Sequence, residues 1–230
     1  MTIRIIRALM ATLTLLLLSG CSTTHHWQQQ LTLVFATPDG EMRASVVHSM
    51  SVNIGWQITQ MIIGDQGRIA NIKGEALVAD LGGGNVLFAL IPSAFLAEQT
   101  GLLPYRNGMG HWIRRLPDQP PIVLTQHTGP GGDIRPTLVT FADLSDPNTL
   151  KIVDPDDLQA TFGPGYALKT VTLTGTDAPR TQIGLKTLLP WLKARGRTHM
   201  YVVDRPNELA PPYPRRYSIR PASFDTELYN

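Results

Sequence analysis

The sequence has almost no cysteine and no apolar stretch long enough to span a membrane as a helix. Among its 230 residues Cys21 is the only cysteine, so no disulfide can form within the chain. The uncharged stretch at residues 8–18 would reach about 16 Å as a helix, against about 30 Å of hydrocarbon in a bilayer. The fold must therefore be stabilised by a hydrophobic core, which a chain of this length can supply.

An excess of charge of one sign is also lacking. The chain has 20 Lys and Arg against 18 Asp and Glu, a formal net charge of +2. Arg4 and Arg7 lie in the first seven residues, and without them the two signs balance. Bulk charge therefore gives no indication of nucleic acid as a partner.

Recognisable catalytic and cofactor-binding motifs are missing as well. The sequence has no His-Glu-x-x-His, no Gly-x-Ser-x-Gly and no phosphate loop, because the glycines at 82–84 lack the following Gly-Lys-Ser/Thr. We therefore predict a turn at 82–84 and no cofactor or metal site. His48 lies inside a β-rich run, and we expect it to be a hydrogen-bonded strand residue rather than a base.

The N-terminal residues have the pattern of a secretory signal: two arginines, the apolar stretch 8–18, two small residues, then Cys21. Leu18-Ser19-Gly20-Cys21 resembles the lipobox of bacterial lipoproteins. This resemblance implies cleavage before Cys21, a diacylglycerol thioether on its sulfur and a further acyl chain such as palmitate on the new amino group. An ordinary signal peptide with a chance cysteine is the alternative.

The lipobox resemblance implies attachment to a bacterial membrane on its periplasmic face. Ser22 rather than Asp after the cysteine favours the outer membrane over the inner one, by analogy with enteric bacteria. The expected organisation is a signal peptide at 1–20, a polar tether at 21–30, a single β-rich domain at 31–204 and a Pro/Arg-rich C-terminal tail at 205–230.

The expected fold class is α+β, predominantly antiparallel β with a few short helices. Pro38-Asp39-Gly40 and the 82–84 glycines are predicted turns between strands. Alternating and β-branched segments predict strands at 31–37, 42–52, 53–63, 75–81, 86–91, 122–126, 137–142 and 166–174. Short helices are predicted at 94–100 and from Pro155, with Asp154 as the N-cap.

Five aspartates gather between residues 143 and 157, which suggests either calcium binding or capping. A calcium loop alternates its acids around a central glycine, and the spacing here is different. Local capping of turns and helix ends by Asp143, Asp146, Asp154, Asp156 and Asp157 is the favoured interpretation.

The run 138–171 resembles a set of uncharacterised proteobacterial proteins. It contains Leu-Val-Thr-Phe, then Asp-Pro, then the Val-Asp-Pro-x-Asp-Leu-x-Ala-Thr-Phe-Gly-Pro-Gly signature at 153–165. Segments 73–76, 87–90 and 188–192 fit the same proteins, whereas Tyr166 stands where an aliphatic residue is expected. This resemblance implies no activity, cofactor or catalytic residue.

Two functions follow as hypotheses. The first is a non-enzymatic, lipid-anchored module that contacts an envelope protein, peptidoglycan or lipopolysaccharide. The second is an envelope hydrolase with a site in the loops 104–135, where His111 or His127 would lie beside a carboxylate. The tail at 205–230 is expected to be an extended, polyproline-like segment. It is either a basic docking arm or a tail that lies along the domain surface.

Overall fold

The computed structural model describes residues 23–54, 68–91, 120–124, 128–129, 132–133, 135–194, 201–204 and 216–228. The chain divides into two compact units, one of residues 1–26 with 51–71 and one of residues 27–50 with 72–230. The predicted helix at 94–100, most of the predicted strand at 53–63, and Cys21, His111 and His127 lie outside the described residues.

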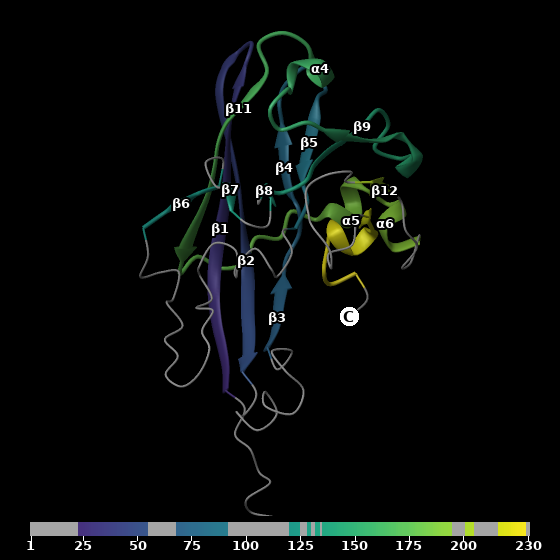
Figure 1. The fold of residues 1–230 in the computed structure, drawn as a ribbon. Coiled ribbons are helices and arrows are strands. Elements are labelled where there is room, and N and C mark those ends of the chain that lie inside the picture. The colour runs from purple at the N-terminus through teal and green to yellow at the C-terminus, as the bar shows by residue number, and fades with distance from the viewer. Residues whose placement is uncertain are drawn as a thin grey trace, which may run out of the picture. The chain divides into compact units, whose positions relative to one another are not determined.

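A five-stranded sheet has the order β3-β2-β1-β11-β6 (Figure 1). Its members are β1 (Thr23–Thr37), β2 (Gly40–Ile54), β3 (Arg68–Lys73), β6 (Ile122–Val123) and β11 (Ala167–Thr176). A two-residue turn at Pro38 and Asp39 joins β1 to β2, as predicted, and Gly40 has a φ of +123°. The Thr37 hydroxyl donates to the Gly40 carbonyl at 2.9 Å, which closes the turn.

Strand β1 begins earlier than the predicted strand at 31–37. Residues 23–30, expected as part of the tether, belong to β1, and Trp27 and Gln29 are buried with Leu31 and Leu33. The physical reason is that every second residue from Trp27 onward points to the buried face. The polar neighbours at the alternate positions concealed this period in the sequence.

Strand β11 pairs with β1 along nearly its whole length. Leu31 lies opposite Leu173 and Leu33 opposite Val171, with a register shift between Val34 and Phe35. The paired side chains are buried and form one apolar face of the sheet. Strand β6 pairs only with the middle of β11 and is an edge strand, as predicted, a position that the two preceding prolines tolerate.

A four-stranded antiparallel sheet has the order β10-β9-β5-β4. Its strands are β4 (Leu77–Asp80), β5 (Val86–Ala89), β9 (Leu138–Phe141) and β10 (Leu150–Val153). The glycines at 82–84 turn the chain between β4 and β5, as predicted, and the amide of Leu81 donates to the carbonyl of Asn85 at 2.8 Å. Both faces are buried, with Leu87 and Leu138 on one and Phe88 and Val139 on the other.

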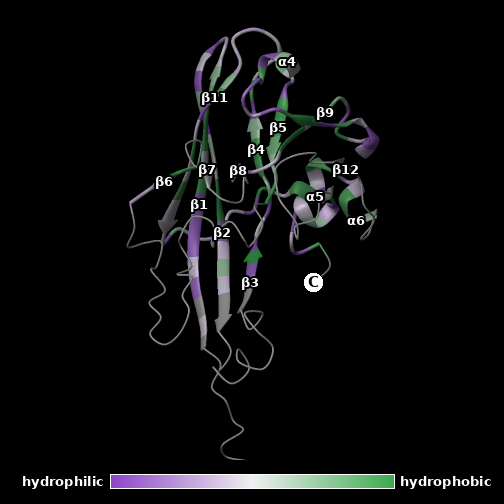
Figure 2. Ribbon diagram, viewed as in Figure 1, coloured by the Kyte–Doolittle hydropathy of each residue, from purple (hydrophilic) through white to green (hydrophobic). Residues whose placement is uncertain are grey.

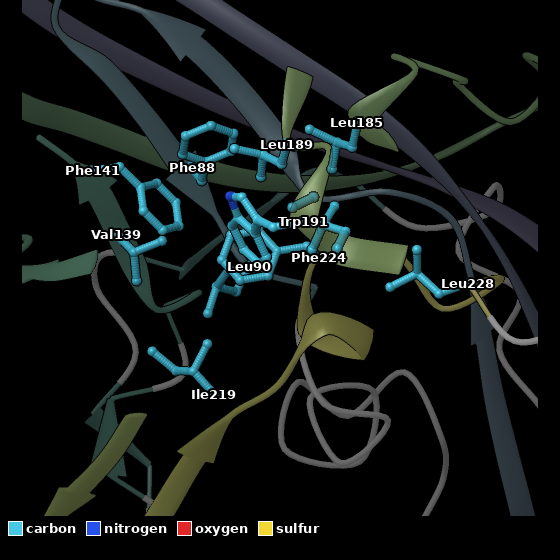
Figure 3. Close-up of a cluster of buried hydrophobic side chains, with 12 residues drawn as sticks. Phe88, Leu90, Val139, Phe141, Leu185, Leu189, Trp191, Ile219, Phe224 and Leu228 are labelled. Atoms are coloured by element: carbon cyan, nitrogen blue, oxygen red, sulfur yellow. The ribbon is translucent and has the colours of Figure 1, made fainter. Parts of the chain in front are cut away.

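The second of these faces carries an aromatic core (Figure 3). Figure 2 shows that β5 and β9 are largely hydrophobic. The aromatic core packs against α5 (Leu185–Leu188), α6 (Trp191–Ala194) and the C-terminal residues that follow the 3-10 helix η5 (Pro221–Ser223). The rings of Phe88 and Phe141 lie 5.6 Å apart edge to face, and those of Trp191 and Phe224 lie 5.9 Å apart in the same manner. Such contacts add to the hydrophobic stabilisation.

The described part of the C-terminal segment is packed, and the prediction of an extended tail is wrong there. β12 (Tyr201–Asp204) pairs with β13 (Arg216–Ile219), and Ile219, Phe224 and Leu228 are buried in the aromatic core. The prediction followed the high proline and arginine content of this segment. Its few apolar residues decide the structure instead, because their burial is favourable. Residues 205–215 lie outside the described part of the chain.

The helix predicted from Pro155 begins later, at α4 (Gln159–Phe162). The carboxylate of Asp154 accepts from the amide of Asp156 at 2.9 Å, so Asp154 stabilises a turn rather than a helix start. The Asp157 carboxylate accepts from the Ala160 amide at 3.1 Å within the first turn.

The described structure is mostly antiparallel β with a few short helices, as predicted, although the α+β label is loose for helices of four residues. The remaining short elements are η4 (Pro147–Thr149), β7 (Thr128–Gly129) and β8 (Gly132–Asp133). Within the described ranges no helix has the length and apolarity needed to cross a bilayer.

Candidate functional site

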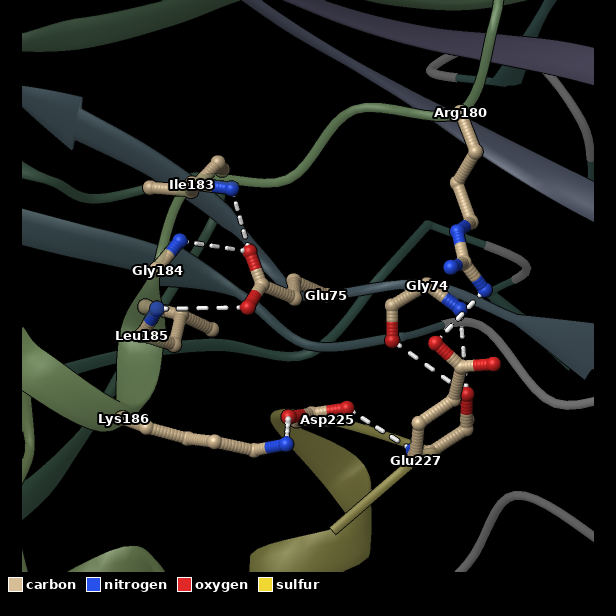
Figure 4. Close-up of polar contacts among 10 residues, drawn as sticks. Gly74, Glu75, Arg180, Ile183, Gly184, Leu185, Lys186, Asp225 and Glu227 are labelled. Atoms are coloured by element: carbon tan, nitrogen blue, oxygen red, sulfur yellow. Dashed lines mark hydrogen bonds and ion pairs between the residues drawn. The ribbon is translucent and has the colours of Figure 1, made fainter. Parts of the chain in front are cut away.

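A polar hollow of about 390 Å³ opens between three segments that are far apart in the sequence. Gly74 and Glu75, just before β4, form one side. The stretch 180–184 with Lys186 forms a second side, and Asp225 with Glu227 forms the third. Figure 4 shows the side chains of these segments converging.

Next to Gly74 and Glu75, which line one side of the hollow, lies His48 of β2, which is fully buried. Its Nε2 is 2.9 Å from the carbonyl oxygen of Glu75, and because a carbonyl only accepts, Nε2 must carry the proton. Nδ1 is buried and finds no hydrogen-bond partner among the described residues. Burial lowers the pKa of His48 below its ordinary value, which favours the neutral ring. His48 lies in β2 and is hydrogen-bonded, as predicted.

Gly74 lies directly on the His48 ring. Its φ is +155°, and a Cβ at this position would be 2.6 Å from Cδ2 of His48. Glycine is therefore required at 74 both by the backbone conformation and by the close approach of the imidazole. The contact fixes where the chain enters the hollow.

The carboxylate of Glu75 serves as the cap of α5. It accepts hydrogen bonds from the amides of Ile183, Gly184 (2.9 Å) and Leu185 (3.3 Å) (Figure 4). These amides belong to the start of the helix and have no acceptor within it. Glu75 thus supplies from a distant segment what a local N-cap normally supplies.

Two ion pairs join the other sides of the hollow. Nη1 of Arg180 lies 2.6 Å from Oε2 of Glu227, and Nζ of Lys186 lies 3.4 Å from Oδ2 of Asp225. The hydrogen bond from Arg180 lowers the pKa of Glu227 below its ordinary value. Both acids come from the C-terminal segment and both bases from the stretch 180–186, so the two sides have opposite charge.

Backbone hydrogen bonds fix the acidic side. The amide of Ala76 donates to the Phe224 carbonyl at 2.6 Å, and the amide of Thr226 donates to the Gly74 carbonyl at 3.1 Å. The Gly74 amide donates in turn to the Thr226 hydroxyl at 3.0 Å. The acidic side is therefore held against residues 74–76 by an isolated antiparallel β-bridge between Glu75 and Asp225.

The basic side is fixed to β2. The Thr181 amide donates to the Val47 carbonyl at 3.1 Å, and the Val47 amide donates to the Thr181 hydroxyl at 3.0 Å. The backbone next to Arg180 is therefore anchored to β2, and Lys186 belongs to α5. Rigid walls of this kind are typical of a preformed site.

Four of the five aspartates between 143 and 157 accept backbone amides in turns or at a helix start, as predicted, whereas Asp156 pairs with Arg135. Asp143 accepts from the Ser145 amide at 2.8 Å, and Asp146 accepts from the Asn148 amide at 2.9 Å. The Asp156 carboxylate takes both guanidinium nitrogens of Arg135, at 2.6 and 2.7 Å. Within the described ranges no three His, Cys, Asp or Glu side chains group closely enough to hold a metal ion.

The hollow itself was missed in the sequence. Glu75, Arg180 and Asp225 stand in three unrelated local contexts, and no spacing pattern links them. Gly74 and Gly184 both have a positive φ, but a glycine in the sequence is too common a signal to single out a site.

Comparisons add no relative: no family model, no curated protein and no solved structure matches this chain. The resemblance of the run 138–171 to uncharacterised proteobacterial proteins stays a prediction.

Proposed function

We propose that this chain is a lipid-anchored envelope protein that works as a binding module facing the periplasm, with Cys21 as the lipid attachment. The lipobox pattern Leu18-Ser19-Gly20-Cys21, placed where a signal cleavage site is expected, supports the anchor. The resemblance of the run 138–171 to proteobacterial proteins supports a bacterial envelope. Envelope proteins, peptidoglycan and lipopolysaccharide are the classes of partner that the location offers.

The observation that supports binding over catalysis is the state of the charged groups around the hollow. The Glu75 carboxylate accepts three backbone amides, and Nε2 of His48 is committed to a carbonyl. Arg180 and Lys186 each have an acidic partner. A general base needs a lone pair directed at a substrate proton, whereas the carboxylates of Glu75, Asp225 and Glu227 are engaged in contacts that hold the fold. The unpaired Nδ1 of His48 is buried.

The anchor is tested with a Cys21→Ala variant of the full chain. The native protein is expected in the membrane fraction with an N-terminal mass that includes acyl chains, because three chains bind far more firmly than one. The Cys21→Ala protein is expected in the soluble or unprocessed fraction without that mass. Ser22→Ala is the matched control and should stay acylated; an unmodified sulfur in the native protein would contradict the proposal.

Outer-membrane sorting is a separate part of the proposal. A Ser22→Asp variant should move the acylated protein from the outer-membrane to the inner-membrane fraction on density separation. Equal distribution of Ser22→Asp and native protein would count against sorting by this residue while leaving the anchor intact.

A further inference from the structure

Three buried side-chain atoms in β1 and β2 have no hydrogen-bond partner. Within the described part of the chain these atoms are Nε1 of Trp27, Oε1 of Gln29 and Nδ1 of His48. The three side chains are only 9%, 2% and 0% exposed. An unpaired polar atom is costly at such burial, and an ordered water is the usual partner where the protein supplies none.

The pairing of β1 with β2 brings two of these side chains together. The strands are neighbours in the five-stranded sheet and are joined by the two-residue turn at 38–39. Counting back from this turn along both strands places Gln29 opposite His48 and Gln28 opposite Ser49. The Ser49 hydroxyl donates to Oε1 of Gln28 at 2.9 Å, which agrees with this register.

Trp27 belongs to the same face of the sheet, because it precedes Gln29 by two residues. Side chains directly opposite each other across two antiparallel strands have Cβ atoms about 5 Å apart. Diagonal neighbours, such as Trp27 and His48, are about 7–8 Å apart, which aromatic side chains can reach across. On its other side Gln29 lies opposite Gly175 of β11, which has no side chain to fill the space beside the amide.

The hydrogen-bonding types of the three atoms decide what fits between them. The indole nitrogen of Trp27 only donates, and Oε1 of Gln29 only accepts. Nδ1 of His48 accepts, because Nε2 carries the proton that faces the Glu75 carbonyl. One water molecule offers two O–H donors and a lone pair, which is the complement of this set, and buried waters typically make about three hydrogen bonds.

Other small ligands match the set less well. The hydroxyl of an alcohol has one proton to donate and would leave one of the two acceptors unpaired. A cation would face the N–H of Trp27, and an anion would face the acceptors of Gln29 and His48. Neither ion would find an opposite charge among the three groups, and a buried charge without a counter-charge is strongly unfavourable.

We propose that β1 and β2 hold one ordered water molecule between Trp27, Gln29 and His48. The water donates to Oε1 of Gln29 and to Nδ1 of His48, and it accepts from Nε1 of Trp27. It thereby links the start of β1 to the imidazole that contacts Gly74 and the Glu75 carbonyl. This internal site goes beyond the binding module proposed above and does not depend on Cys21.

The test is NMR of the purified, detergent-solubilised full chain labelled with ¹⁵N, in which magnetisation transfer from water is measured at the indole N–H protons. Trp27 should give a cross peak to a long-lived bound water. Trp191 is the matched control, because it is 8% exposed and its Nε1 donates to the Leu144 carbonyl at 2.8 Å, so it should give none. Trp27→Phe and Trp191→Phe assign the two signals.

A pair of variants locates the water between the strands. Gln29→Met removes the amide acceptor while keeping a side chain of similar length, and the cross peak at Trp27 should be lost. Gln28→Met changes the neighbouring residue, whose side chain bonds to Ser49, and should leave the cross peak unchanged. An unshifted Trp191 signal shows that each variant is folded. The comparison of Trp27 with Trp191 in the native chain needs no variant and stands if Gln29→Met does not fold.

Absence of a water cross peak at Trp27 would overturn the proposal. Equal cross peaks at Trp27 and Trp191 would do the same, because they would report exchange with bulk solvent. A cross peak at Trp27 that persists in folded Gln29→Met protein would place the water away from Gln29 and would also overturn it. None of these results depends on acylation, so the test of Cys21 and this one can fail separately.

Discussion

At the scale of single residues, His48 combines a polar ring with full burial. The ring is fully buried, gives one hydrogen bond to the Glu75 carbonyl and has a second nitrogen with no partner in the described structure. A neutral ring tolerates this environment, whereas a charged ring would pay the cost of desolvation. Gly74 packs so closely on the ring that a side chain at position 74 would clash with it.

Stability should therefore depend on pH through His48. Its pKa is lowered from 6.5 in the folded chain, so below pH 6.5 the unfolded chain binds more protons and acid favours unfolding. The free energy of unfolding should be unaffected by His48 above about pH 6.5 and should fall by up to about 1.4 kcal/mol per pH unit below it. Denaturant unfolding between about pH 5 and pH 8 measures this dependence.

A His48→Gln variant provides the comparison, because its amide can still donate to the Glu75 carbonyl but does not titrate. It should show a smaller acid dependence than the native chain, and His26→Gln at an exposed position should not. The lowered pKa values of Asp156 and Glu227 act at lower pH, where those acids take up protons. Identical acid dependence in native and His48→Gln protein would show that His48 is not the group involved.

At the scale of elements, α5 depends on a residue about a hundred positions away. Its first amides are bonded to the Glu75 carboxylate, and the sequence separation between Glu75 and Gly184 is 109 residues. A helix of one turn has almost no stability alone, since nucleation costs more than a single turn returns. The cap and the burial of Leu185 against the aromatic core together hold α5 in place.

Removal of this cap should destabilise the protein. Glu75→Ala leaves three amides without their acceptor and should lower the free energy of unfolding by about 1–2 kcal/mol. Glu75→Gln retains one acceptor oxygen and should cost less. Denaturant unfolding gives the total, and hydrogen exchange of the Leu189 amide, bonded to the Leu185 carbonyl, reports on α5 itself. The control is the exposed Glu41→Ala; an equal effect of both substitutions would contradict the capping role.

The elements that could be predicted from the sequence are those with local causes. Alternation and turn residues predicted the hairpin around Pro38, the turn at 82–84, the edge strand β6 and the strand β11. The cluster of aspartates between residues 143 and 157 predicted turns that are capped by carboxylates. Each of these structures is decided within about ten residues by backbone preference and side-chain period.

The elements that were missed depend on distant partners. Strand β1 extends N-terminal of the predicted start partly because β11 pairs with Gln28, Gln29 and Gln30. Phe224 is buried because Phe88 and Trp191 form a place for it. The hollow assembles from residues that no local rule connects, so neither Glu75 nor Arg180 could be recognised as part of a site before the fold was known.

At the scale of the whole molecule, the described core is closed by its most C-terminal residues. Phe224 contacts the rings of Phe88, Phe141 and Trp191, and the backbone beside it is bonded to Ala76. No disulfide supports the fold, so the loss of such a residue is not compensated. The C-terminal segment is a structural part of the protein rather than an appendage.

A Phe224→Ala substitution should therefore lower the free energy of unfolding by about 3–5 kcal/mol, as expected for a fully buried phenylalanine. Val123→Ala at the edge of the five-stranded sheet, where the side chain is 37% exposed, should change it by no more than about 0.5 kcal/mol. Denaturant titration measures both. A small change for Phe224→Ala would favour the extended tail that the composition suggested.

The bond between Gly74 and Thr226 also has a consequence for biosynthesis. Thr226 is added to the chain 152 residues after Gly74, which at ribosomal speed takes about 8 to 30 seconds. Until Phe224 has been added, Phe88 and its neighbours cannot be fully buried. The incomplete chain therefore exposes apolar surface, to which chaperones bind. A chain that is truncated shortly before residue 224 should consequently be degraded by proteases rather than accumulate as a folded, shortened protein.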